Sequence, residues 1–116
     1  MEIEVEKPLI YQLLEQGRKD ELEEKLESWL PDELAELCND LNAQEQSVIF
    51  SVIDRDQAYQ TFEILDLNAQ VLLIEVLRYR QLQLILNDMS ADNRTALLEQ
   101  LESEQLNKLL KLLTQK

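Results

Sequence analysis

The sequence predicts an all-α protein, a superhelix or solenoid of about nine or ten short helices with a twelve-residue repeat. Three observations support this fold class. The 116 residues contain a single glycine and two prolines, whereas the tight turns and bulges of a sheet protein usually need several positions with positive φ. Hydrophobic residues make up 45% of the chain, which is enough for a folded core. Apolar side chains also recur every twelve residues along most of the sequence.

The repeat consists of two apolar positions three residues apart, which place both side chains on one face of a helix. The later position of each pair holds Leu30, Leu41, Ile53, Leu65, Leu77, Met89, Leu101 and Leu113. The earlier position holds Cys38, Phe50, Phe62, Ile74, Leu86, Leu98 and Leu110. We expect these side chains to form the core. The residue after each pair is often one that caps a helix, as in Asn42, Asp54, Asp66 and Ser90.

The expected helices are, in order, 9–16, 19–29, 32–41, 44–53, 56–65, 68–77, 79–88, 91–101 and 103–114. Gly17 suits the left-handed position after the first helix, and Pro31 suits the first turn of the third. Ser90 with Asn93 resembles a capping box, but the usual Glu or Gln is absent from its fourth position.

Helices of this length are marginal alone in water, so they must pack on one another. The turns are short, and we therefore expect consecutive helices to be neighbours in space. The chain is expected to form one domain over 1–116, with residues 1–8 flexible.

The composition excludes many kinds of functional site. The chain has no histidine and one cysteine, so it lacks an imidazole base, an internal disulfide and a cysteine-rich zinc site. We expect no enzyme activity. Cys38 occupies a core position of the repeat and is expected to be a buried, inert thiol. No stretch approaches the ~20 apolar residues of a transmembrane helix, so we expect no membrane insertion of this chain.

The charge is strongly acidic and unevenly distributed. The 24 Asp and Glu residues against 11 Lys and Arg give a formal net charge of −13, which opposes binding to nucleic acid. Most of the excess lies before residue 59, with nine acidic residues between Asp20 and Asp40. This surface either keeps the protein soluble or responds to divalent cations or a basic partner, and the sequence leaves both interpretations open.

The pattern as a whole resembles the cytosolic N domain of the MgtE family of magnesium transporters. Two runs carry the resemblance, WLPDELAELCNDL at 29–41 and LNDMSADNRTALLEQL at 86–101, and their order and spacing extend it from about Leu9 to Leu113. The resemblance implies a right-handed superhelix of short helices. It also implies a location on the cytosolic face of the plasma membrane, as a regulatory, Mg²⁺-sensing part of a transporter that is itself a homodimer.

In that family the N domain precedes a pair of CBS domains, a connecting helix and a transmembrane channel. Mg²⁺ held between these parts keeps the assembly compact and the pore closed. The resemblance therefore implies Mg²⁺ as the ligand, and the CBS domains and connecting helix as the partners. Because half of each interfacial site would lie outside this chain, we expect it to bind Mg²⁺ only weakly by itself.

The resemblance also points to one metal-binding residue. The family's acidic residues lie at the start of the helix that follows the Met-Ser pair, and the first of them corresponds to Asp92. The other acidic positions correspond to Asn93, Ala96 and Gln60, which are neutral. Asp92 is therefore the candidate ligand, shared with a CBS domain. The alternative is that Asp92 only stabilises the start of its helix through its charge.

A second function is also compatible with the sequence. The chain contains neither CBS domains nor membrane helices, so it is either an excised domain or an independent protein. In the second case it would be a helical-repeat scaffold, similar to an armadillo-like motor-switch domain, that binds a protein partner without metal.

Overall fold

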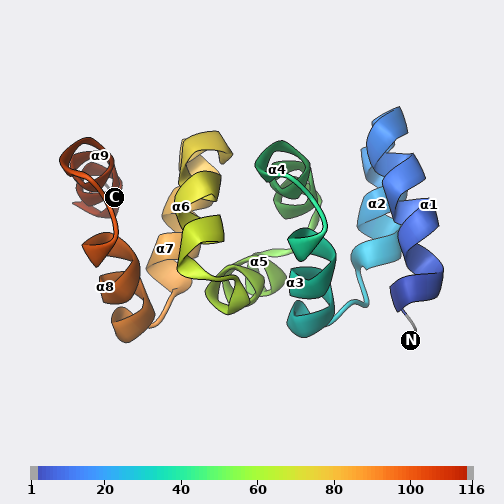
Figure 1. Cartoon of the computed structure of the whole chain (residues 1–116), viewed down its shortest axis with the longest axis horizontal. Helices are drawn as coiled ribbons and strands as arrows, with labels where there is room; N and C mark the ends of the chain where they lie inside the picture. The colour runs from blue at the N-terminus through green and yellow to red at the C-terminus, as the bar shows by residue number, and fades with distance from the viewer. Residues whose placement is uncertain (1–2, 115–116) are drawn as a thin grey trace.

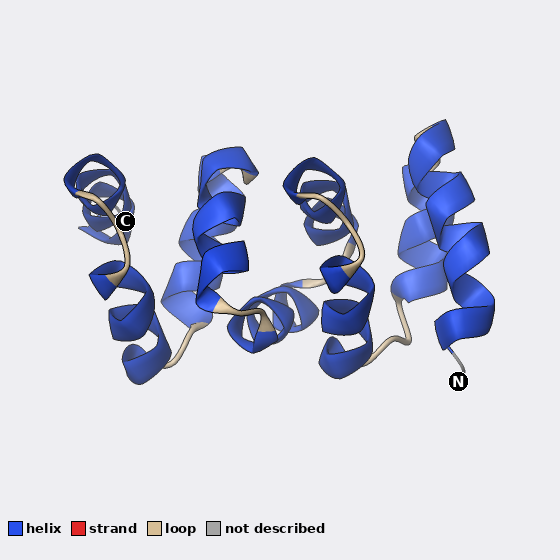
Figure 2. Ribbon diagram, in the orientation of Figure 1, coloured by secondary structure: helices blue, strands red, loops and turns tan. Residues whose placement is uncertain are grey.

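The structure, a computed structural model, describes residues 3–114 and confirms the all-α fold class. Within that range the chain forms nine helices and no strand (Figures 1 and 2). They are α1 (Ile3–Gln16), α2 (Lys19–Leu26), α3 (Pro31–Asn39), α4 (Ala43–Val52), α5 (Arg55–Ile64), α6 (Leu67–Val76), α7 (Tyr79–Asp88), α8 (Ala91–Glu99) and α9 (Ser103–Thr114). They stack along one direction, and the molecule measures 40 × 23 × 23 Å.

The twelve-residue repeat has a simple local cause. Each of the helices α4 to α7 has ten residues and is followed by two residues in extended conformation. After α4 these are Ile53 and Asp54, with ψ of 161° and 172°. Asp54 then accepts a hydrogen bond from the backbone N–H of Gln57, which caps α5. Asn42, Asp66 and Ser90 cap their helices in the same way, so the expected caps are confirmed.

The helices pack mainly on the second helix along the chain rather than on the next one. The main pairs are α3 with α5, α4 with α6, α5 with α7, and α7 with α9. Consecutive helices are also neighbours in space, as expected: α1 packs on α2, and side-chain hydrogen bonds link α3 with α4, α5 with α6, and α7 with α8. Each two-residue extended turn changes the direction of the chain sharply. The second turn brings the chain back, so a helix packs on the one two places before it.

The buried residues confirm most of the expected core and correct two positions. Cys38, Phe62, Ile74 and Leu86 are fully buried, and Phe50 packs edge-on against Phe62 with 6.2 Å between the ring centroids. Leu30, however, is 64% exposed, and Trp29 is buried instead. Trp29, not Leu30, lies twelve residues before Leu41 and so keeps the register of the repeat.

The second correction lies in the last helix. Leu110 is 43% exposed, whereas Leu109 and Leu112 are buried. α9 packs on α7, and the face of α9 that carries Leu109 and Leu112 supplies its buried side chains. Leu110 follows Leu109 directly, which rotates its side chain about 100° away from that face.

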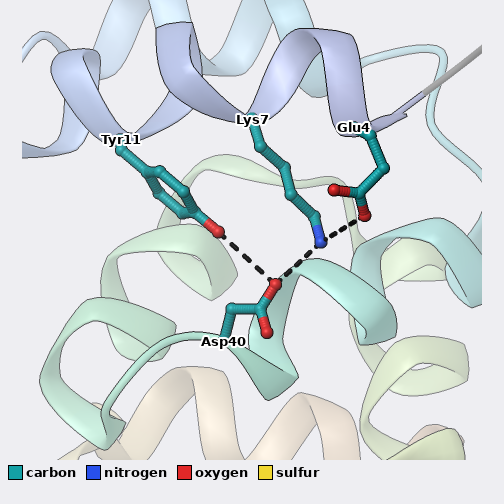
Figure 3. A network of polar contacts seen from close by, with 4 residues as sticks. All are labelled: Glu4, Lys7, Tyr11 and Asp40. Carbon is teal, nitrogen blue, oxygen red and sulfur yellow. Dashed lines mark hydrogen bonds and ion pairs between the residues drawn. The ribbon is translucent and has the colours of Figure 1, made fainter.

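The first helix begins earlier than expected. α1 starts at Ile3 and contains Pro8, so residues 3–8 are helical where a flexible segment was predicted; residues 1–2 of that prediction lie outside the described residues. Lys7 is buried between the helices and donates hydrogen bonds to Asp40 at 2.7 Å and to Glu4 at 2.9 Å. Tyr11 donates to the same Asp40 carboxylate (Figure 3). These contacts attach the start of α1 to the end of α3.

Three polar side chains, of which two are buried, each connect a helix to the one before it. The Nε2 atom of Gln46 donates to the carbonyl oxygen of Cys38, and Nε2 of Gln70 donates to that of Phe62, both at 2.7 Å. Arg94 donates to the carbonyl of Leu86 in the same way. The three donors lie 24 residues apart, so the structural unit is a pair of helices. This longer period was missed in the sequence, where Gln46, Gln70 and Arg94 mark it.

Candidate functional site

Asp92 lies in the first turn of α8, where its side chain is exposed to solvent. Capping of this helix is performed by Ser90, whose hydroxyl oxygen accepts a hydrogen bond from the backbone N–H of Asn93 at 3.2 Å. Within residues 3–114, the carboxylate of Asp92 has no hydrogen-bond or ion-pair partner. It is therefore available to a ligand, and it also carries negative charge near the positive end of the helix dipole.

The start of α8 is held by a residue that the sequence reasoning missed. Oε2 of Glu63, on α5, accepts hydrogen bonds from the backbone N–H of Ser90 at 3.0 Å and from Nδ2 of Asn93 at 2.7 Å. In a complete capping box, a Glu at the position of Asn93 would accept the N–H of Ser90. Glu63 replaces that missing side chain from 27 residues away, so the box is completed between two helices.

Asp88, at the end of α7, is already committed to a protein partner. Its two carboxylate oxygens accept hydrogen bonds from Nε and Nη2 of Arg55 at 2.7 and 2.8 Å. The hydrogen bonds from this guanidinium lower the pKa of Asp88 below its ordinary value. Asp88 therefore serves as a link between α5 and α7 rather than as a free metal ligand.

Cys38 is also unsuited to chemistry. Its side chain is fully buried, and burial raises the pKa of the thiol to about 12. The thiolate is the reactive and metal-binding form of cysteine, so this side chain contributes to packing.

Comparison with known protein families identifies the domain. The family described as the MgtE intracellular N domain matches residues 29–116, which is most of the chain. The chain belongs to this family. The match confirms the resemblance seen in the sequence and relates the chain to a domain of magnesium transporters rather than to an enzyme. The comparison with curated proteins found no match to the chain. Within 3–114, no helix of this MgtE N domain is long and apolar enough to cross a membrane.

The remaining positions that the resemblance singled out lie on the surface of this MgtE N domain. Gln60 is exposed on α5, one turn before Glu63, and its Nε2 atom lies 3.5 Å from the hydroxyl of Tyr59. Ala96 is exposed on α8, one turn after Asp92. Asn93 is occupied by its hydrogen bond to Glu63. Of the four positions, Asp92 is the one that presents a carboxylate to solvent.

The acidic side chains that the structure describes do not form a closed metal site by themselves. Among residues 3–114 there is no group of three or more Asp, Glu, Cys or His side chains placed to hold one metal ion. Mg²⁺ retains several water molecules and is often held by one or two carboxylates. The exposed carboxylate of Asp92 is of the kind that could supply one such ligand.

Proposed function

We propose that this chain is the cytosolic Mg²⁺-sensing domain of a magnesium transporter and that it gates the transporter through Mg²⁺-dependent packing on CBS domains. Membership of the MgtE N domain family is the observation that carries this proposal. In this arrangement the domain lies on the cytosolic face of the membrane, against the CBS domains and connecting helix of a homodimeric parent protein.

The physical basis is the repulsion between acidic surfaces. The chain carries a formal net charge of −13, and two carboxylates that face each other across an interface repel. A divalent cation between them reverses the sign of that interaction and stabilises the packed arrangement. When Mg²⁺ is scarce, the packed arrangement loses this stabilisation and the domain separates.

Asp92 is the proposed contribution of this chain to the interface. Its carboxylate is exposed and has no partner in residues 3–114, while Glu63 fixes the turn that carries it. A single carboxylate with water molecules binds Mg²⁺ weakly. The chain alone is therefore expected to bind Mg²⁺ only at millimolar concentration, and binding strengthens when the CBS domains complete the site.

The first experiment is a titration of the ¹⁵N-labelled chain with MgCl₂, followed by NMR. We expect small chemical shift changes centred on the first turn of α8, and their loss in Asp92→Ala. Asp32→Ala is the matched control, because Asp32 is also exposed in the first turn of its helix, α3. Equal effects of the two substitutions, or a micromolar site on the chain alone, would contradict the assignment of Asp92 as a shared ligand.

The second experiment joins the chain to the CBS domains of an MgtE transporter and measures its radius of gyration by small-angle X-ray scattering. We expect millimolar Mg²⁺ to reduce the radius of gyration and Asp92→Ala to weaken this compaction, with Asp32→Ala behaving as the unmodified protein. A scattering curve that does not change with Mg²⁺ would refute the sensing role.

A further inference from the structure

A hollow between α4, α5 and α7 has a positive lining in an otherwise acidic protein. Four cationic side chains line it, those of Lys19, Arg55, Arg78 and Arg80, against one carboxylate, that of Asp54. We call this site the basic hollow. Since the whole chain has a formal net charge of −13, this local excess of positive charge is the opposite of the general trend.

Three of these cations are not used by the fold. Within residues 3–114, the side chains of Lys19, Arg78 and Arg80 form no hydrogen bond and no ion pair, and all three are exposed. Arg55 differs, because it is paired with Asp88. The chain has more than enough carboxylates to pair with every cation, yet these three cations are unpaired and line the same hollow.

The floor of the basic hollow is apolar. Below the cations lie Ile53 and Leu84, which are partly exposed, and the buried side chains of Phe50, Ala58 and Ile85. The hollow has a volume of about 490 Å³, within the range of sites that take a few side chains or a small ligand. An occupant must therefore combine negative charge at the rim with an apolar group at the floor.

On one side, the neighbouring surface limits the length of an anionic occupant of the basic hollow. A second groove adjoins the basic hollow at Ile53 and Asp54, and its lining includes Asp20, Glu23, Glu24 and Glu27. A long polyanion such as nucleic acid that extended in this direction would meet these carboxylates and be repelled. A short acidic segment of a protein ends before it reaches them.

We propose that the basic hollow is a docking site for a short acidic segment of a protein partner, with an aliphatic side chain on the floor and carboxylates on Lys19, Arg78 and Arg80. The match of charge carries this choice of occupant, because complementary charges steer and orient a partner at an interface. The proposal goes beyond the Mg²⁺-sensing function, since this contact needs no metal ion.

The test uses a fluorescein-labelled heptapeptide with a central leucine and glutamates on both sides, and follows its fluorescence polarisation at low salt in the presence of EDTA. EDTA separates this test from the Mg²⁺ proposal. We expect saturable binding that weakens with added salt. Arg78→Glu should weaken it roughly fivefold, and the double variant Arg78→Glu/Arg80→Glu more than tenfold, as expected when exposed charge pairs are reversed.

Lys111→Glu is the control for net charge, because it changes the net charge equally from α9 and does not line the basic hollow. The affinity of this variant for the peptide should stay within about twofold of that of the unmodified chain. The melting temperature of each variant verifies that it is folded. Alanine in place of the central leucine of the peptide should also weaken binding.

Three outcomes would overturn the proposal. The first is an equal loss of affinity in Arg78→Glu and Lys111→Glu, which would show that only net charge matters. The second is undiminished binding of the peptide that lacks leucine, which would show that any small anion satisfies the site. The third is tighter, Arg78-dependent binding of a single-stranded oligonucleotide, which would make nucleic acid the occupant.

Discussion

Replacing the buried Gln70 by leucine tests whether glutamine side chains hold the helix pairs together. Gln70 is 3% exposed, and its Nε2 atom donates to the carbonyl oxygens of Phe62 at 2.7 Å and of Leu65 at 3.2 Å. These carbonyls lie at the end of α5, where the helix itself supplies no donors. Leucine has a similar volume but cannot donate a hydrogen bond, so both carbonyls lose a partner.

The magnitude follows from the groups left unpaired. Each buried carbonyl without a partner costs about 1–3 kcal/mol. Part of this cost is offset, because Oε1 of Gln70 is itself buried without a hydrogen-bond partner and the substitution removes it. The net effect of Gln70→Leu should be a decrease of about 2 kcal/mol in the free energy of unfolding, which corresponds to a decrease of about 8 °C in the melting temperature for a domain of this size.

Urea denaturation followed by circular dichroism measures this difference at constant temperature. Gln44→Leu is the matched control, since Gln44 is exposed in the first turn of α4, and it should change the free energy of unfolding by less than about 0.5 kcal/mol. If Gln70→Leu is as stable as the control, the buried glutamines do not hold the helix pairs and the interpretation of the 24-residue unit is wrong.

Three further predictions concern other contacts. Arg55 lowers the pKa of Asp88 in the folded state, so the unfolded chain binds the proton first and the ion pair loses its stabilising effect as the pH falls below about 4. The free energy of unfolding of Asp88→Asn should therefore change less between pH 5 and about pH 2 than that of the unmodified chain. The same pH dependence in both proteins would show that the ion pair does not stabilise the fold. Cys38 should react with a thiol reagent such as DTNB only as fast as the protein unfolds, given its burial and its pKa of about 12; a fast reaction in native buffer would refute this. Glu63→Ala should lower the free energy of unfolding by about 1 kcal/mol and speed amide hydrogen exchange at Ser90, so unchanged exchange would show that Glu63 does not cap α8.

The candidate site shows where sequence reasoning reached its limit. The repeat and the capping residue Ser90 predicted where α8 begins, and so placed Asp92 in its first turn. Both signals depend on residues close together in the sequence. The contribution of Glu63 could not be derived in the same way, because its partners lie 27 and 30 residues away. The signal that could have suggested it was the incomplete capping box, since an unfilled position implies that another side chain accepts the N–H of Ser90.

The sequence by itself determined the helices and the turns between them. The bounds of α7 and α9 match the expected ranges 79–88 and 103–114, because capping residues and apolar spacing act over three or four positions. Only the tertiary structure decided which helices touch, why α1 begins at Ile3, and where unpaired cations gather. These features depend on side chains about 30 residues apart, such as Lys7 and Asp40, whose meeting is set by the direction of each turn and not by local preference.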